Sequence, residues 1–338
     1  MQYRNLGRGG LLVSPLCLGT MNFGGPTDAA EAHRLIAISR EAGVNFIDTA
    51  NVYTGGKAER IVGEAIRAER RHWVLATKLN GATGPGPNEC GLSRKAVMEA
   101  VRDSLARLGT DYIDIYYLHR EDRRTPVAET VRAMADLQRE GLIRHFAVSN
   151  HRAWRVAEIC HLCDDLGIDR PIASQPYYNA LNRMPEVEHL PACDYFGLGV
   201  VPYSPVARGV LSGKYDPAAP PPNDSRAARQ DTRLMQTEWR PESFAIAQTL
   251  KAHAEARGIT ASQFATAWVL NNRLITAVIA GPRTEAHLHD YLGALDYRFT
   301  AEDEALVDRL VAPGHPSTPG YTDPTDPVLG RQPRTPPA

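Results

Sequence analysis

The chain has 338 residues, of which 43% are hydrophobic and 23% are charged, and its formal net charge is −1. This composition supports a sizeable core, and the balanced charge gives no general field that would attract nucleic acid or an anionic membrane. No apolar run approaches the roughly 18 residues of a membrane-spanning helix, and the first residues lack the apolar core of a secretory signal. The five cysteines are scattered and make no disulfide framework. We therefore expect a cytoplasmic protein with neither nucleic-acid nor membrane partners.

Short runs rich in β-branched and aromatic residues recur along the chain and predict strands. Several of them are almost continuously apolar, which is typical of parallel strands that are covered on both faces. The predicted strands cover residues 17–21, 45–49, 73–78, 112–119, 144–149, 172–176, 199–203 and 276–281.

Longer amphipathic stretches lie between these runs and predict helices. They cover residues 28–42, 58–69, 93–108, 126–140, 152–166, 243–257 and 285–295, with a shorter helix at 185–190. Glycines follow several of these stretches, as is typical of helix ends where the backbone turns into the left-handed region: Gly43, Gly109, Gly141, Gly167 and Gly258. A strand followed by a helix, repeated eight times, favours a single-domain α/β fold closed into a (β/α)8 TIM barrel over an open sheet.

Three segments exceed this repeat. Residues 7–12 join two short runs and predict an N-terminal hairpin that closes the bottom of the barrel. Residues 204–241 predict a long loop after strand seven, and loops of this length are usually functional lids or disordered. We assign the barrel domain to residues 1–312. The Pro-rich tail of residues 313–338 is not expected to form a helix, and its end is expected to be disordered.

Four ionisable side chains lie where predicted strands end. Asp48 ends strand two, with Tyr53 in the following loop, and Lys78 and His119 end strands three and four. In a TIM barrel the carboxyl ends of the strands carry the active site. Tyrosine, with a pKa of about 10, is a poor acid at neutral pH unless a nearby ammonium stabilises the phenolate. We expect Lys78 to supply that charge, Asp48 to hold the lysine, and His119 to donate to an oxygen that becomes negative during reaction.

Each of these residues alone has a structural interpretation, because a buried Asp–Lys pair or a strand-end histidine often belongs to the core. Their joint placement on three adjacent strands favours a catalytic site.

Two other sequence patterns are weaker evidence for a functional site. Cys160 and Cys163 share a helix face without a second ligand pair, so we expect no metal. The glycines of residues 81–91 lack the strand and helix of a Rossmann fingerprint.

The sequence resembles the aldo-keto reductase family, near its bacterial and channel-subunit-like branches. The resemblance spans residues 3–310, with the matching stretches in family order. They are NFIDTANVY at 45–53, ATK at 76–78, YLH at 117–119, VSN at 148–150, QPYYN at 175–179, PYSP at 202–205 and IAGPR at 279–283. Carried over position by position, Asp48, Tyr53, Lys78 and His119 match the catalytic tetrad of the family, with Tyr53 as proton donor.

The resemblance also implies NADPH or NADP+ as cofactor. Ser149, Asn150 and Gln175 match residues that hold the nicotinamide carboxamide, and Tyr203 matches the aromatic residue that stacks on the ring. The pyrophosphate loop corresponds to Ser204, Val206, Gly209, Leu211 and Lys214, and the 2′-phosphate pair to Arg283 and Thr284. Further cofactor positions are Gly19, Thr20, Met21, Gly281, His287 and Tyr291. At His287 and Tyr291 the family often has Gln and Asn, which leaves open how strictly NADPH is preferred over NADH.

The function implied is NADPH-dependent reduction of aldehydes or ketones, small-molecule carbonyl substrates, with Tyr53 as general acid. Two alternatives stay open: an NADPH-binding regulatory subunit with little turnover, and a sugar or secondary-metabolite ketoreductase that runs mainly as a dehydrogenase. Substrate choice is expected to depend on residues 81–92, 120–125 and 204–241, with the tail from Pro313 as a further candidate. Candidate aromatic lining residues are Phe23, Tyr53, Trp239 and Tyr321. The sequence decides neither the oligomeric state nor the role of the tail.

Overall fold

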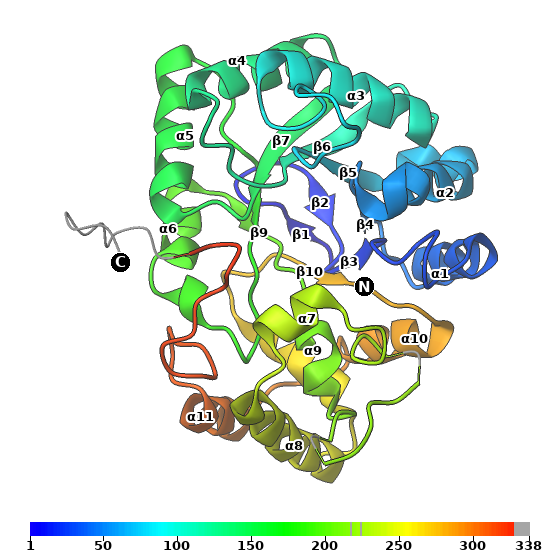
Figure 1. Cartoon of the computed structure of the whole chain (residues 1–338), viewed down its shortest axis with the longest axis vertical. Coiled ribbons are helices and arrows are strands. Elements are labelled where there is room, and N and C mark those ends of the chain that lie inside the picture. Colours follow the sequence, from blue (N-terminus) through cyan, green and yellow to red (C-terminus); the bar gives the residue numbers. More distant parts are fainter. Residues whose placement is uncertain (217, 224, 328–338) are drawn as a thin grey trace.

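The protein, described by a computed structural model over residues 1–216, 218–223 and 225–327, is built around an eight-stranded parallel sheet (Figure 1). In sheet order the strands are β10 (Val278–Ala280), β3 (Leu16–Gly19), β4 (Phe46–Asp48), β5 (Val74–Leu79), β6 (Ile113–Leu118), β7 (Ile143–Ser149), β8 (Ala173–Gln175) and β9 (Gly199–Val200). A parallel bridge between Tyr203 and Ile279, with Ile279 N donating to Pro202 O at 2.9 Å, closes the sheet into a barrel. Each of the eight predicted strands is confirmed, and the predicted TIM barrel with them.

The predicted N-terminal hairpin is confirmed. Strand β1 (Arg4–Asn5) pairs antiparallel with β2 (Leu12–Val13). Leu6 and Val13 are fully buried and pack into the apolar interior of the barrel with Phe46 and other strand residues. Gly7, with φ of +58°, lies so close to the backbone at the start of β9 that a Cβ would be 2.5 Å from Gly197 O. The hairpin therefore covers the end of the barrel from which the strands start.

Helices surround the barrel (Figure 1). A second and larger apolar cluster lies between the sheet and these helices. The helices are α1 (Ala29–Glu41), α2 (Lys57–Ile66), α3 (Arg94–Leu108), α4 (Val127–Arg139), α5 (Ala153–Leu166), α6 (His189–Phe196), α7 (Thr232–Thr237), α8 (Pro241–Ala256), α9 (Ala261–Asn271), α10 (Glu285–Gly293) and α11 (Ala301–Leu310). None of the described helices has both the length and the apolar character that crossing a membrane would require.

Helix α6 differs from the sequence prediction. The short helix expected at 185–190 is a 3₁₀ turn, Met184–Glu186, followed by α6 from His189 onwards. Pro191 lies in the first turn of α6, where its missing N–H costs no intrahelical hydrogen bond, so the helix continues past it. The 204–241 segment is likewise not a plain loop, since it contains a 3₁₀ stretch, Ala207–Ser212, and α7.

The described part of the Pro-rich tail lies against the barrel. Pro316 bridges to Asn182, Ser317 N donates to Leu181 O at 2.8 Å, and Asp323 pairs with Arg233 of α7. Residues 313–327 contain no helix, as expected. The expectation of disorder concerns the end of the tail, of which residues 328–338 lie outside the described residues.

A buried carboxylate joins α11 to α8. Asp303 is fully buried and accepts from His253 at 2.6 Å, from the Tyr297 hydroxyl at 2.9 Å and from Thr300 N at 2.8 Å. Burial alone would raise the pKa of Asp303, but these hydrogen bonds outweigh burial and lower it to about 2. Because the folded pKa lies below the unfolded value of about 3.9, this carboxylate stabilises the fold above about pH 4.

We expect the free energy of unfolding to fall as pH drops from about 4 towards 2, partly through protonation of Asp303. Urea unfolding across that range should show a shallower loss in Asp303→Asn, which has no such proton to gain. Glu302→Gln, an exposed neighbour on α11, is the control and should keep the wild-type pH profile. If Asp303→Asn also keeps that profile, this carboxylate is not a source of the acid sensitivity.

Candidate active site

The four predicted catalytic residues meet at the carboxyl ends of adjacent strands. Asp48 is the last residue of β4, Lys78 lies in β5, and His119 directly follows β6. Tyr53 begins a 3₁₀ turn after β4, which returns its hydroxyl towards the strand ends. The parallel register pairs Asp48 with Ala76 and Lys78 with Tyr117. The convergence inferred from the strand ends is therefore present in the fold.

Lys78 is fully buried and each of its three ammonium hydrogens has an acceptor. Its Nζ donates to Asp48 Oδ1, to Thr49 O at 2.8 Å and to the Tyr53 oxygen at 3.1 Å. The other oxygen of Asp48 accepts from Gln175 Nε2 at 3.0 Å. Because Lys78 already donates to the Tyr53 oxygen, the hydroxyl proton of Tyr53 remains for another acceptor.

The charges in this cluster are set by burial and by the partners. Burial would lower the pKa of Lys78, but Asp48 and Tyr53 outweigh it and raise that pKa, so the lysine is cationic. Burial raises the pKa of Tyr53 by more than Lys78 lowers it. The sequence analysis expected Lys78 to make Tyr53 more acidic. In the structure, the effect of burial on the pKa of Tyr53 is larger than the effect of Lys78. Tyr53 consequently keeps its proton at neutral pH.

His119 faces Tyr53 edge-on, with the ring centroids 6.0 Å apart and the planes at 80°. Burial, and then the positive charges of Lys78 and Arg120, lower the pKa of His119 to about 3. The imidazole is therefore neutral at pH 7. A neutral imidazole still carries one N–H, so it can donate one hydrogen bond without adding a charge.

The tetrad lies in a cleft with a cavity volume of about 320 Å³. Most of the predicted site residues line it: Gly19, Thr20, Met21, Asp48, Tyr53, His119, Ser149, Asn150, Gln175, Tyr203, Ser204, Val206, Gly209, Lys214, Gly281, Arg283, His287 and Tyr291. Three do not. Lys78 is buried and contacts the cleft-lining residues Asp48 and Tyr53, and Leu211 is a core residue. Thr284 caps α10, accepting from His287 N at 3.4 Å.

Comparisons with known proteins agree with this geometry. Residues 15–312 match the Aldo/keto reductase family. The chain belongs to the aldo/keto reductase family. It is 39% identical over 302 residues to a probable voltage-gated potassium channel subunit beta of Arabidopsis thaliana, covering 88% of this chain and 92% of that protein. A protein of the same description from Oryza sativa subsp. japonica is 40% identical over 317 residues, covering 92% and 96%. Members of the aldo/keto reductase family use NADPH or NADP+.

Four residues of the aldo/keto reductase motifs are connected by hydrogen bonds beside the tetrad, and we call them the shelf: Ser149, Asn150, Gln175 and Tyr203. Ser149 Oγ donates to Gln175 O at 2.9 Å, and Asn150 Nδ2 donates to Ser149 Oγ at 3.1 Å and to His119 O at 3.0 Å. The Tyr203 hydroxyl donates to Asn150 Oδ1 at 2.9 Å. Asn150 has a φ of +56°, an unfavourable backbone conformation for a residue with a side chain, and these contacts hold it there. These hydrogen bonds hold the shelf residues in fixed positions relative to one another.

Positive charge gathers around Lys214 in the same cleft. Its side chain is exposed to solvent, yet the surrounding protein and the arginines at 283, 226 and 229 lower its pKa to about 8. Partial burial, Lys214 and Arg283 also lower the pKa of His287. Cations crowded in this way repel one another, and an anion placed among them removes the repulsion. The cleft therefore fits a cofactor with phosphate groups, as NADPH has.

Several lining residues were not predicted individually, although Arg120 and those between residues 204 and 241 lie in segments expected to determine substrate choice. They are Asn22, Arg120, Pro205, Arg208, Ser212, Arg226, Asp231, Arg233, Ser262, Ile279, Asp290, Thr325 and Asp326. One signal was usable, because Asp290 lies three residues after His287 and so shares its helix face. Most of the others lie in the 204–241 segment or in the tail, where no periodicity exists to orient them.

Three of the four aromatic candidates do not line the cleft. Phe23 is fully buried in the core. Trp239 packs edge-on against Tyr215 and Phe244, with centroids 5.2 and 4.8 Å apart. Tyr321 is covered by the Arg240 guanidinium 3.9 Å from its ring centre. Only Tyr53 of the four lines the cleft, so the prediction that the other three are lining residues is wrong.

The Cys160 and Cys163 pair lies on the buried face of α5. Burial raises the pKa of each thiol to about 12, so neither is a reactive thiolate at neutral pH. Among the described residues no group of three or more His, Cys, Asp or Glu side chains is arranged to hold a metal ion.

Proposed function

We propose that this protein reduces aldehydes or ketones with NADPH. One observation carries the proposal: Lys78 donates to the Tyr53 oxygen from a fully satisfied position, which leaves the Tyr53 proton for an acceptor in the cleft. A hydroxyl held in this way can act as a general acid, because the Lys78 ammonium offsets part of the cost of forming a buried phenolate. A packing role for the same residues would not need the hydroxyl at the cleft surface.

When NADPH is bound, it supplies a hydride to the carbonyl carbon of the substrate. The residues of the chain handle the proton. Tyr53 transfers its proton to the oxygen that becomes negative, and the resulting phenolate faces the Lys78 ammonium 3.1 Å away. Asp48 keeps that ammonium charged and in place. The product is an alcohol, and Tyr53 regains a proton from solvent.

His119 positions the carbonyl in this proposal. Because the imidazole is neutral, it donates a hydrogen bond to the substrate oxygen without competing with Tyr53 for the role of acid. The Asn150 amide holds the backbone carbonyl of His119 at 3.0 Å. Thus the shelf expected to bind the nicotinamide carboxamide and the residue expected to orient the substrate are directly connected.

Arg283 is expected to select NADPH over NADH through the adenosine 2′-phosphate. A hydrogen bond to a charged group contributes about 1.5–3 kcal/mol, so Arg283→Ala should weaken NADPH binding roughly 10–100-fold and NADH binding far less. Fluorescence titration with each nucleotide measures both dissociation constants. The exposed Arg132→Ala on α4 is the control. Equal losses for the two nucleotides would mean that Arg283 does not read the 2′-phosphate.

The proposed activity is tested by NADPH oxidation with a panel of aldehydes, α-dicarbonyls and keto sugars, and by the reverse reaction with the corresponding alcohols and NADP+. We expect turnover with at least one carbonyl class, and the ratio of forward to reverse rates separates a reductase from a dehydrogenase. Tight NADPH binding without turnover on any carbonyl would contradict the proposal. Absence of nucleotide binding would also remove its basis.

A second candidate function is an accessory subunit of an ion channel. The observation that favours it is the identity of 39% and 40% to two proteins described as probable voltage-gated potassium channel subunits beta. In that case NADPH binding would persist with slow turnover, and the protein would co-purify with a channel from its own cells. Rapid turnover of a carbonyl substrate, with no channel in the purified complex, would favour the reductase over the channel subunit.

A further inference from the structure

The segment that follows β9 has an unusual backbone. Ser204, Ala207 and Arg208 all have positive φ, at +60°, +46° and +51°. Residues with side chains rarely adopt this conformation, and they keep it only where their surroundings hold them. The same segment carries Ser204, Val206, Gly209 and Lys214, which line the cleft. Something outside the local sequence must therefore hold this part of the cleft wall.

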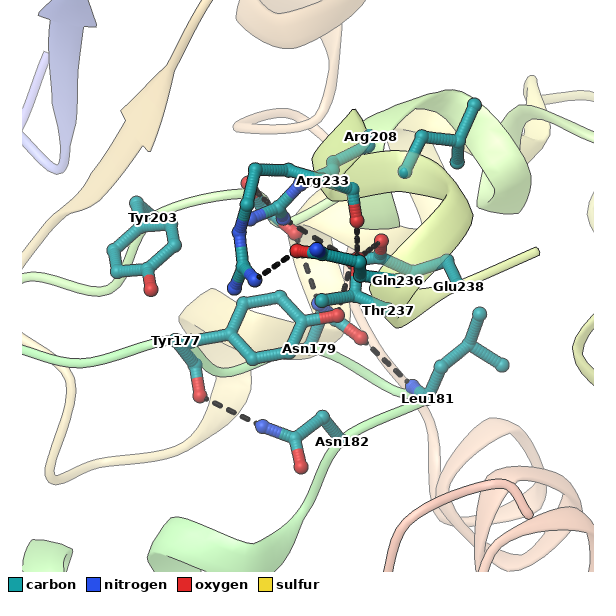
Figure 2. Close-up of polar contacts among 12 residues, drawn as sticks. Tyr177, Asn179, Leu181, Asn182, Tyr203, Arg208, Arg233, Gln236, Thr237 and Glu238 are labelled. Carbon is teal, nitrogen blue, oxygen red and sulfur yellow. Dashed lines mark hydrogen bonds and ion pairs between the residues drawn. The ribbon is translucent and has the colours of Figure 1, made fainter. Parts of the chain in front are cut away.

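Glu238, just after α7, is the centre of the contacts that hold this segment (Figure 2). Its side chain is fully buried, and one carboxylate oxygen accepts from the Tyr177 hydroxyl and from Arg208 Nη1, the latter at 3.2 Å. The other oxygen accepts from the Thr237 hydroxyl. The Arg208 guanidinium also lies 5.3 Å from the centre of the Tyr177 ring. A buried ion pair thus joins residue 208 to residue 238, across the whole segment.

The same cluster supports the residues that follow β9 directly. The ring of Tyr177 lies 5.6 Å from that of Tyr203, tilted by 30°, and the two residues form a parallel bridge. Arg208 Nη1 donates to Ser204 Oγ at 3.4 Å, and Asn179 Nδ2 donates to Ser204 O at 3.1 Å. Figure 2 shows Tyr177 and Asn179 approaching from the chain after β8. Tyr203 and the strained Ser204 are consequently held by contacts from Tyr177, Asn179 and Arg208.

We propose that Tyr177, Arg208 and Glu238 are positioning residues, the Glu238 latch, that hold residues 203–214 in their cleft-lining form and so set how tightly NADPH is retained. Arg208 itself lines the cleft, whereas Tyr177 and Glu238 do not, so these two act through Arg208, Tyr203, Ser204 and the strained turn. Breaking the latch leaves the Arg208 charge buried without its partner and frees the strained turn to relax. The inference needs nucleotide binding alone and holds whether or not the protein reduces carbonyls.

The test compares Glu238→Gln and Tyr177→Phe with the wild type. Glu238→Gln keeps the side-chain shape and removes the charge, so the dissociation constant and dissociation rate of NADPH should rise by about tenfold or more. Tyr177→Phe keeps the ring against Tyr203 and removes one hydrogen bond, so a rise of several-fold, roughly 2–10-fold, is expected. NADPH fluorescence in stopped flow measures both constants without any substrate.

Amide hydrogen exchange of the nucleotide-free protein gives a second measurement. Residues 203–214 should exchange faster in both variants, while amides of the barrel strands β5 and β6 should not. A role confined to general stability would raise exchange throughout the molecule instead. Because exchange is measured without nucleotide, it separates a loosened segment from a lost cofactor contact.

Tyr178→Phe is the matched control. Tyr178 is the neighbouring buried tyrosine, and its hydroxyl also donates to a glutamate, Glu186, at 2.7 Å, away from the cleft. It should bind NADPH as the wild type does. Unchanged NADPH dissociation in Tyr177→Phe and Glu238→Gln would overturn the proposal, as would an equal effect in Tyr178→Phe. If Glu238→Gln does not fold, Tyr177→Phe against Tyr178→Phe decides the question.

Discussion

Replacing Tyr53 with phenylalanine is expected to lower kcat/KM for carbonyl reduction by about 10²–10⁴-fold. The ring stays in place, but the proton that faces the cleft is gone, and no other described side chain hydrogen-bonds to Lys78 Nζ from a position at the cleft except Asp48, which is an acceptor. NADPH affinity should change little, because Tyr53 lies among the tetrad rather than among the cations around Lys214. Steady-state NADPH oxidation and NADPH titration measure the two effects separately.

Tyr117→Phe is the control for this loss. Tyr117 is fully buried in the barrel, and its ring centre lies 6.0 Å from Lys78 Nζ, but it does not line the cleft. Its replacement should leave most of the activity. Tyr53→Phe with wild-type kcat/KM would show that the proton comes from elsewhere. A lower NADPH affinity that accounted for the whole loss would assign Tyr53 to binding instead of proton transfer.

Replacing Lys78 with methionine is expected to damage both stability and activity. Asp48 would then be a buried carboxylate without its cation, and removal of one partner of a buried ion pair destabilises a protein by about 3–5 kcal/mol. The activity falls as well, because the phenolate of Tyr53 loses the charge that stabilises it. Denaturant unfolding gives the free energy of unfolding, and NADPH oxidation gives the rate.

The double variant Asp48→Asn/Lys78→Met separates the two consequences. Neither charge is then buried, so much of the lost stability should return while the activity stays low. Lys95→Met, which removes an exposed pair with Glu99 on α3, should cost only about 0.3–0.5 kcal/mol. A Lys78→Met protein as stable as wild type would mean that Asp48 is protonated or rehydrated in its place.

The sequence contained the barrel and the tetrad because their signals are local and repeated. Apolar strand runs and amphipathic helices recur with fixed periods, and Asp48, Lys78 and His119 lie at or next to strand ends that a parallel barrel must bring to one rim. Helix α9 (Ala261–Asn271) was missed for the opposite reason, since most of its residues are buried and it has no clear polar face. Helix α11 did carry a signal, the Thr300 and Asp303 capping box.

Motif matches alone did not say where side chains point. Leu211 and Thr284 match the cofactor-binding pattern, yet one packs in the core and the other caps α10. The pKa of Tyr53 was also misjudged, because proximity to Lys78 is visible in the sequence pattern whereas burial is not. Desolvation depends on everything that surrounds a group, and only the packed structure supplies it.

The sequence by itself thus determined the fold class, the family of the protein and the gathering of Asp48, Lys78 and His119 at one end of the barrel. Only the tertiary structure decided which residues of the 204–241 segment and the tail reach the cleft, Arg226 and Asp326 among them, and that Glu238 is buried against Arg208 and Tyr177. These segments have no period that fixes their orientation. Their conformation follows from contacts between residues far apart in the chain, such as Arg233 with Asp323, and a one-dimensional pattern does not encode which of many such contacts form.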